Sequence, residues 1–151
     1  MKETKEELSL SEAVTHLLEE CRMVLPGIQT LFGFQLIAVF NSTFSEKLSS
    51  FEQRLHLTAI CLVVVAIALV MAPAAYHRQQ GAKIVTTDFV VTATWLLLLS
   101  MFPLMIALCL DFYLIARLVL NQPLFSAVLS SLLLLVFAVL WFVFPRLRAK
   151  S

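Results

Sequence analysis

The sequence predicts an all-α integral membrane protein: a four-helix bundle preceded by a short amphipathic helix. Of its 151 residues, 60% are apolar and only 14% are charged, whereas a soluble domain has about 25% charged residues. Four stretches contain no Asp, Glu, Lys or Arg, and each is close to the roughly 20 apolar residues that a spanning helix needs. These spans cover residues 23–40, 55–76, 89–110 and 124–144. The composition excludes an ordinary soluble domain, a disordered chain and a nucleic-acid-binding module.

The distribution of positive charge predicts the direction of the spans. Of the 11 Lys and Arg residues, eight fall in the N-terminal segment, the loop after the second span and the C-terminal tail. Because cytoplasmic segments carry the excess of Lys and Arg, we expect both termini in the cytoplasm. The membrane domain is then 23–145, between an acidic cytoplasmic segment at 1–22 and a basic cytoplasmic tail at 146–151.

Capping residues precede the expected helices. Ser9 and Glu12 have the spacing of a capping box, which predicts a short helix from about Ser9 to Arg22. Ser49 and Glu52 repeat this spacing before the second span. Further start signals are Thr86, Thr87 and Asp88 before the third span and Pro123 before the fourth, since Thr and Asp suit a helix N-terminus and Pro suits the first helical position.

The end of the third span is open to two interpretations. Apolar character continues past Asp111 to Leu120, and a helix from Phe89 to Leu120 is about 48 Å long, longer than an apolar core of about 30 Å. Either this helix projects beyond the membrane, with a bend at Pro103, or it ends near Tyr113 before a short interfacial segment. We expect Asp111 near the outer interface. If the span instead shifts toward the C-terminus, Asp111 is buried and becomes a functional candidate.

The first span holds most of the polar residues within the membrane. Gln29 and Gly33 share one helical face with Arg22, whereas Gln35 points nearly the opposite way. We expect the Gln29 face to pack on another helix, with Gly33 allowing a close approach and Gln29 donating a hydrogen bond across it. The alternative is a lining for a pore or a substrate. Because the two glutamines cannot face one partner, one of them is a candidate contact with a second subunit.

Partly desolvated charges need partners, and the expected topology limits which charges can meet. We predict an Arg54–Asp111 ion pair on the outer side. On the inner side we predict that Arg22 or Arg78 contacts Asp88, Glu19 or Glu20. The alternative is that each charge reaches water or lipid headgroups independently. Tyr76 and His77 fall at the inner interface, where amphipathic rings settle, and His77 is also a candidate proton relay.

Three segments, 22–34, 51–54 and 72–78, together with Asp111 late in the third span, carry a family resemblance that covers about residues 10–145. Through them the chain resembles a family of small bacterial four-span membrane proteins that is catalogued only as a domain of unknown function. The resemblance implies a helical inner-membrane protein without an assigned activity. The family residues it marks are Arg22, Pro26, Gly27, Gln29, Gly33, Arg54, Pro73, Tyr76, His77 and Arg78.

The sequence contains no HExxH, CxxC, P-loop or GxSxG motif and no pair of carboxylates inside the spans. We therefore expect no catalytic residues, no cofactor, no metal and no nucleic-acid partner. The favoured interpretation is a structural or accessory protein that associates with itself or with other membrane proteins, in contact with the lipid bilayer. The alternative is an oligomeric ion channel or small-solute transporter. The candidate functional or packing residues are Arg22, Gln29, Gly33, Gln35, Arg54, Tyr76, His77, Arg78, Asp88 and Asp111.

Overall fold

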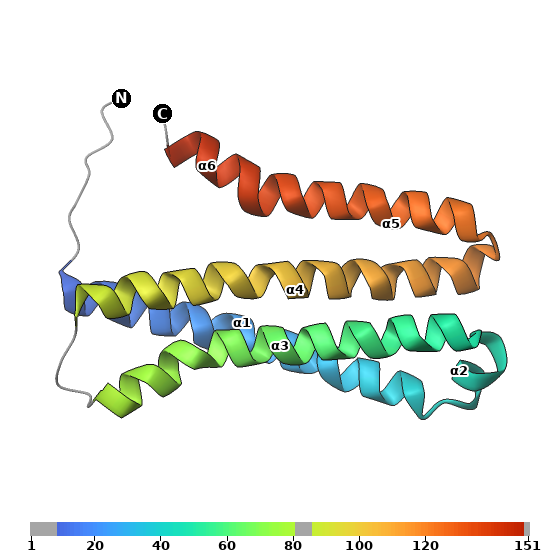
Figure 1. The fold of residues 1–151 in the computed structure, drawn as a ribbon, viewed down its shortest axis with the longest axis horizontal. Coiled ribbons are helices and arrows are strands. Elements are labelled where there is room, and N and C mark those ends of the chain that lie inside the picture. The colour runs from blue at the N-terminus through green and yellow to red at the C-terminus, as the bar shows by residue number, and fades with distance from the viewer. Residues whose placement is uncertain (1–8, 81–85, 150–151) are drawn as a thin grey trace.

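The computed structural model describes residues 9–80 and 86–149, and in these ranges every regular element is a helix (Figure 1). Four helices are long and apolar enough to cross a membrane, so the predicted all-α membrane bundle is confirmed. The elements are α1 (Leu10–Val39), α2 (Ser42–Lys47), α3 (Ser50–Gln80), α4 (Thr87–Leu120), α5 (Pro123–Ala138), the π-helical turn η1 (Val139–Val143) and α6 (Phe144–Ala149).

Helix α1 is longer than the sequence predicts. Ser9 and Glu12 form the expected capping box, with the Ser9 backbone N–H donating to Glu12 Oε2 at 2.9 Å. The helix then continues without interruption through Pro26 to Val39. The expected short helix and the first span are therefore one rod. A buried stripe of Val14, Leu17, Cys21 and Ile28 runs across the predicted boundary, so one packing face supports both parts.

The start of α3 follows its predicted signal, and a short helix precedes it. The Ser49 backbone N–H donates to Glu52 Oε2 at 2.8 Å, and the Glu52 N–H donates back to Ser49 Oγ at 3.3 Å. This reciprocal pair satisfies backbone donors that the first turn leaves open. Helix α2, which the sequence analysis did not predict, covers the end of the bundle between α1 and α3 (Figure 1).

Helix α4 settles one of the open alternatives. It begins after Thr86, whose side chain accepts from the Phe89 N–H at 3.2 Å. It runs 34 residues, through Pro103, and ends only at Leu120. The interpretation in which the helix ends near Tyr113 is therefore wrong. Asn121 ends the helix in the left-handed conformation at φ 53°, which Asn tolerates better than most residues.

The last span, which begins with α5, lies on one side of the bundle. Helix α5 begins at Pro123, as predicted. Figure 1 shows α4 between α5 on one side and α3 on the other, with α1 crossing behind α3. Small side chains at the α3–α4 contact, including Ala59, Ala66, Ala93 and Ala107, are fully buried and allow the close backbone approach that stabilises membrane helix pairs. The outer faces of α1 and α5 carry exposed apolar side chains, as expected of surfaces that meet lipid.

Candidate functional site: a buried polar network at one end of the bundle

Three helices contribute to a polar network around Asp111. The Gln35 side chain on α1 donates from Nε2 to Asp111 Oδ2 at 2.6 Å. His56 on α3 places Nδ1 3.3 Å from Asp111 Oδ1. Gln35 and His56 are only 3% and 7% exposed, and the Asp111 side chain is 14% exposed. The network therefore joins α1, α3 and α4 away from solvent.

The hydrogen bonds constrain the protons on His56. Its Nε2 lies 3.0 Å from the Gln35 backbone oxygen. A carbonyl oxygen only accepts hydrogen bonds, so Nε2 carries a hydrogen. The other ring nitrogen faces a carboxyl oxygen, and that contact is favourable when one proton lies between the two groups. The pair is then either an imidazolium with a carboxylate or a neutral imidazole with a carboxylic acid.

An ion pair lies beside this network, toward the end of the bundle. Arg117 Nε on α4 is 3.4 Å from Glu52 Oε1 on α3, and the two side chains are 28% and 12% exposed. Arg117 also donates from Nη1 to the Asn121 side chain at 2.9 Å. Glu52 thus serves both the helix cap at Ser49 and the contact between α3 and α4. The two pairs together balance two acids against one arginine and one histidine.

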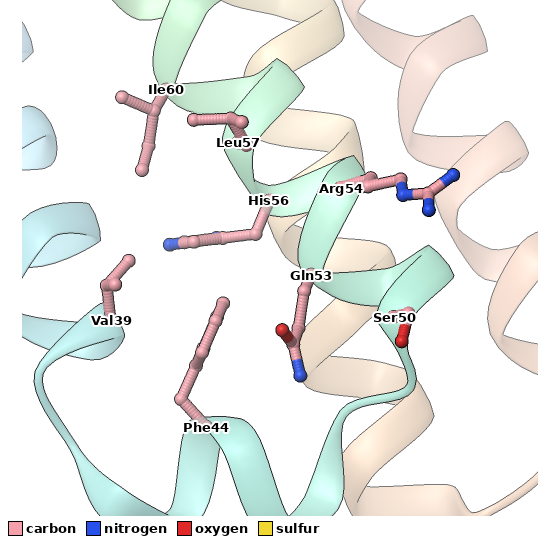
Figure 2. Close-up of a pocket in the computed structure, with 8 residues that line it drawn as sticks. All are labelled: Val39, Phe44, Ser50, Gln53, Arg54, His56, Leu57 and Ile60. Atoms are coloured by element: carbon pink, nitrogen blue, oxygen red, sulfur yellow. The ribbon is translucent and has the colours of Figure 1, made fainter.

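His56 separates two cavities that share the Phe44 ring as a wall. One cavity, of about 380 Å³, is lined by α3 residues, Val39 and Phe44 (Figure 2). The other, of about 230 Å³, is lined by His56, Gln35 and Asp111 together with apolar side chains of α1, α2 and α4. The Phe44 and His56 ring centroids are 5.2 Å apart, so the short helix α2 packs an aromatic ring against the imidazole.

Two oxygens of the network have no hydrogen-bond partner among the described residues. They are Gln35 Oε1 and Asp111 Oδ1, and both are shielded from solvent. The His56 Nδ1 contact to Asp111 Oδ1 lies within ion-pair range without the alignment of a hydrogen bond. Buried acceptors without a donor are costly, and both residues line the smaller cavity. The site can therefore accept further hydrogen bonds.

The predicted outer ion pair is wrong. Asp111 pairs with His56, and Arg54 makes no ion pair among the residues that the structure describes. Arg54 and His56 are two residues apart on a helix, so their side chains point about 200° apart. Figure 2 shows the Arg54 guanidinium directed away from the imidazole. Because His56 faces α4, Arg54 points away from α4 and cannot reach Asp111.

The predicted inner ion pairs are also not formed. Within residues 9–80 and 86–149, neither Arg22 nor Arg78 pairs with Asp88, Glu19 or Glu20. Glu19 instead lies 3.7 Å from His16 on its own helix. His77 and Tyr76 pack their rings on Phe89, with centroid distances of 5.6 and 5.5 Å. These two residues contact the start of α4, far from His56 and Asp111 along the bundle.

Within residues 9–80 and 86–149, no other helix covers the Gln29 face of α1. Gln29 and Arg22 are exposed, and no atom lies within 4 Å of where a Cβ on Gly27 or Gly33 would stand. The expected close approach of a neighbouring helix at Gly33 is therefore not observed among the described residues. The opposite directions of Gln29 and Gln35 are confirmed, because Gln35 is buried and Gln29 is not.

Sequence reasoning named Gln35 and Asp111 but missed His56, Glu52 and Arg117 as site residues. A signal for two of them was present. The buried positions of α3 include 52, 56, 59, 63, 66 and 70, a single helical stripe. Glu52 and His56 extend this apolar stripe with polar groups, which indicates partners on the facing helix. Within the described residues, no cluster of His, Cys, Asp or Glu is placed to hold a metal ion.

Comparison with known families agrees with this architecture. A model of a family of unknown function, DUF6328, matches residues 2–145. The chain belongs to this family. No curated protein and no solved structure matches the chain. The membership of DUF6328 carries no activity, so a function for the polar network must be argued from its geometry.

Proposed function

We propose that the protein binds a small solute at the Asp111 network and exchanges it for a proton, the elementary step of a proton-coupled transporter. The observation that carries the proposal is the buried contact between His56 Nδ1 and Asp111 Oδ1, 3.3 Å apart, beside a cavity. No bond of the solute is made or broken in this function. The structural and accessory interpretation becomes the second candidate.

The energetic argument favours a functional pair over a structural one. Ionisable residues within a membrane protein are costly and mark ion, proton or substrate sites by default. Apolar side chains of similar volume would hold α1, α3 and α4 together at least as well, because a buried ion pair adds little net stability. Unlike Leu, a His–Asp pair can gain or lose a proton. The resulting change in charge is compensated if a solute that carries the opposite change in charge binds or leaves at the same time.

The positive-charge count supports an orientation for this site. With both termini in the cytoplasm of a bacterium and the chain in the inner membrane, the Asp111 end of the bundle faces the outside. Cysteine labelling tests this orientation in a variant without the native cysteines. Ser45→Cys on α2 should react with an impermeant maleimide in intact cells, and Arg146→Cys should react only after lysis. The reverse pattern would overturn the orientation without affecting the proton site.

Infrared difference spectroscopy tests the proton exchange itself. Protein in nanodiscs is titrated across the pH range in which it stays folded. We expect a pH-dependent band of the His56–Asp111 pair, either a carboxylic acid C=O band or an imidazolium ring band, that is lost or shifted in Asp111→Asn. We call it the Asp111 band. The matched control is Asp88→Asn, which removes an exposed carboxylate from the other end of the same helix and should leave the Asp111 band in place. If no band depends on Asp111, the pair does not exchange protons and the proposal fails.

A second candidate function, self-association, is favoured by the uncovered Gln29 face. Gln29 lies in the middle of a predicted span yet is exposed, and an amide facing lipid lacks partners. In a two-fold dimer the same face meets itself, so the two Gln29 amides can satisfy each other. Gly33 on this face leaves room for the second helix. Cross-linking of Gln29→Cys in a background without native cysteines should give a dimer. Val24→Cys, which is exposed on the side of α1 about 140° away from Gln29, is the control and should give no dimer.

A further inference from the structure

The smaller cavity combines an apolar wall with hydrogen-bond acceptors at one end. Its apolar residues include Leu31, Phe34, Ala38, Leu114, Ile115 and Leu118. Its polar residues are Gln35, His56 and Asp111. Gln35 Oε1 and Asp111 Oδ1 accept no hydrogen bond from the described residues, and Gln35 is only 3% exposed. Such a lining fits a ligand with an apolar body and a group that donates hydrogen bonds.

We propose that this cavity binds an organic cation: an amine with an apolar body, whose ammonium group donates to Asp111 Oδ1 and Gln35 Oε1. The proposal rests on the proposed function and names its substrate class. A neutral donor would satisfy the same oxygens, but it would not change the charge of the site. Charge balance therefore distinguishes the cation from other ligands that fit the cavity.

The balance follows from the charged groups that surround the pair. Asp111 and Arg117 face it from α4, and Glu52 lies on its own helix α3. Helix α1 contributes the Gln35 amide and α2 contributes the Phe44 ring, while Arg54 points away (Figure 2). With one proton on the His56–Asp111 pair, the set is neutral: two acids, one arginine and one imidazolium.

An added ammonium group would leave a net positive charge in this desolvated place. Release of the shared proton restores neutrality. Before binding, the pair is an imidazolium and a carboxylate, with no net charge. After binding and proton release, the site holds a neutral imidazole, a carboxylate and an ammonium group, again with no net charge. The His56 Nε2–H remains bonded to the Gln35 carbonyl oxygen. The proton leaves from between Nδ1 and Oδ1, which frees Nδ1 to accept from the ammonium group. One proton is released for each cation bound.

The position of the cavity wall indicates how the ligand arrives. Phe34 and Ile115 line the cavity and are also 66% and 59% exposed. Since these residues lie within helices that are apolar enough to cross a membrane, their exposed surfaces meet lipid. The cavity is thus reached from the side, through the bilayer, and not through a channel along the bundle axis. An amphiphilic amine that partitions into membranes is concentrated at this opening.

Isothermal titration of the full-length protein in nanodiscs tests the inference, with benzylamine as the probe. Titration in two buffers of different ionisation enthalpy gives the number of protons released. We expect saturable binding with release of one proton per benzylamine. Benzyl alcohol, which keeps the ring and lacks the charge, should release none. Sodium and ammonium chloride serve as cations without an apolar body and should bind at least about tenfold more weakly, because they lose the contribution of the wall.

Matched variants test whether the measured binding of benzylamine and the proton release occur at the Asp111 cavity. Asp111→Asn should abolish proton release, and Asp88→Asn should behave as wild type. Gln35→Leu removes the second acceptor and should weaken binding roughly tenfold, whereas Gln29→Leu on the exposed face of the same helix should not. Ala38→Phe fills the cavity and should abolish benzylamine binding while the Asp111 infrared band persists. This last variant keeps the test decisive if Asp111→Asn fails to fold.

The outcomes separate the two proposals. If the Asp111 band titrates but benzylamine binding is absent, or is unchanged by Ala38→Phe, the cation inference is wrong and the proton-exchange function stands. Equal binding of benzyl alcohol with no proton release would likewise overturn the cation inference, since the site would then recognise only the ring. If the Asp111 band itself is absent, both proposals fail together.

Discussion

The Gln35 side chain donates to Asp111 at 2.6 Å across a sequence separation of 76 residues. This contact joins the first long helix to the third, close to the end of the bundle at which α2 lies. Asp111 Oδ2 receives the Gln35 donor while Oδ1 faces His56, so the two carboxyl oxygens have different neighbours. Gln35 therefore holds the carboxylate with its other oxygen facing the imidazole.

The first prediction compares the two glutamines of α1. Gln35→Leu should lower the free energy of unfolding by about 0.6–1.7 kcal/mol, the range for hydrogen bonds between membrane helices. Gln29→Leu, on the exposed face, should change it by no more than about 0.5 kcal/mol. Reversible unfolding in mixed micelles, followed by circular dichroism, measures both. Equal effects would mean that the bond to Asp111 contributes nothing specific.

The second prediction concerns the coupling between His56 and Asp111. In a double-mutant cycle with His56→Leu and Asp111→Leu, the double variant should be more stable than the sum of the single losses implies. We expect a coupling of about 0.5–3 kcal/mol, because each single change leaves a buried polar group without its partner.

The control cycle for this pair uses the opposite end of the same two helices. His77 on α3 and Asp88 on α4 form no ion pair in the described part of the chain. His77→Leu and Asp88→Leu should therefore add to within about 0.3–0.5 kcal/mol. Additivity at both ends would show that the 3.3 Å contact carries no energy.

Much of the fold follows from local signals in the sequence. Length and apolar composition give the spans, the Ser49–Glu52 box gives the start of α3, and Pro123 gives the start of α5. Each of these signals acts within a few residues of the chain. The junction at Arg22 was mispredicted because polarity changes there while the buried stripe of α1 does not. A change in composition marks the membrane boundary, but it does not end a helix.

The candidate site depends on contacts that no local signal contains. Asp111 was expected to form an ion pair with Arg54 on α3, but it pairs with His56, two residues later on the same helix. Charge alone favours Arg54, but helix phase decides between the two residues, and phase is set by how α3 packs on α4 along Ala59 and Val63. If the apolar stripe of α3 had been extended back to Glu52, His56 would have been placed on the face of α3 that packs against α4. The Gln35 contact could not be found this way, since nothing in α1 specifies its distance from α4.

The third prediction concerns the Glu52–Arg117 pair. Arg117→Gln should destabilise the protein by about 1 kcal/mol, since the pair is partly exposed and exposed pairs contribute up to about that amount. The effect should shrink as salt is added, because screening weakens the attraction in the wild type. Arg54→Gln is the control: it lies on α3 and is exposed, and its effect should stay within about 0.5 kcal/mol at every salt concentration. A loss that is independent of salt would assign the role of Arg117 to its bond with Asn121.

The fourth prediction concerns the attachment of α5. Ser130 Oγ donates to the Cys109 carbonyl oxygen on α4 at 2.6 Å, a polar contact between two otherwise apolar helices. Hydrogen bonds between membrane helices contribute about 0.6 kcal/mol on average and about 1.7 at most. Ser130→Ala should therefore lower the free energy of unfolding by about that average. The neighbouring Ser131, which is exposed, supplies the matched control, and Ser131→Ala should have no measurable effect. Since α5 packs mainly on α4 among the described residues, the loss in Ser130→Ala should appear as easier release of α5, measured by faster hydrogen exchange in residues 123–138. Uniformly faster exchange in all helices would show instead that the contact supports the whole bundle.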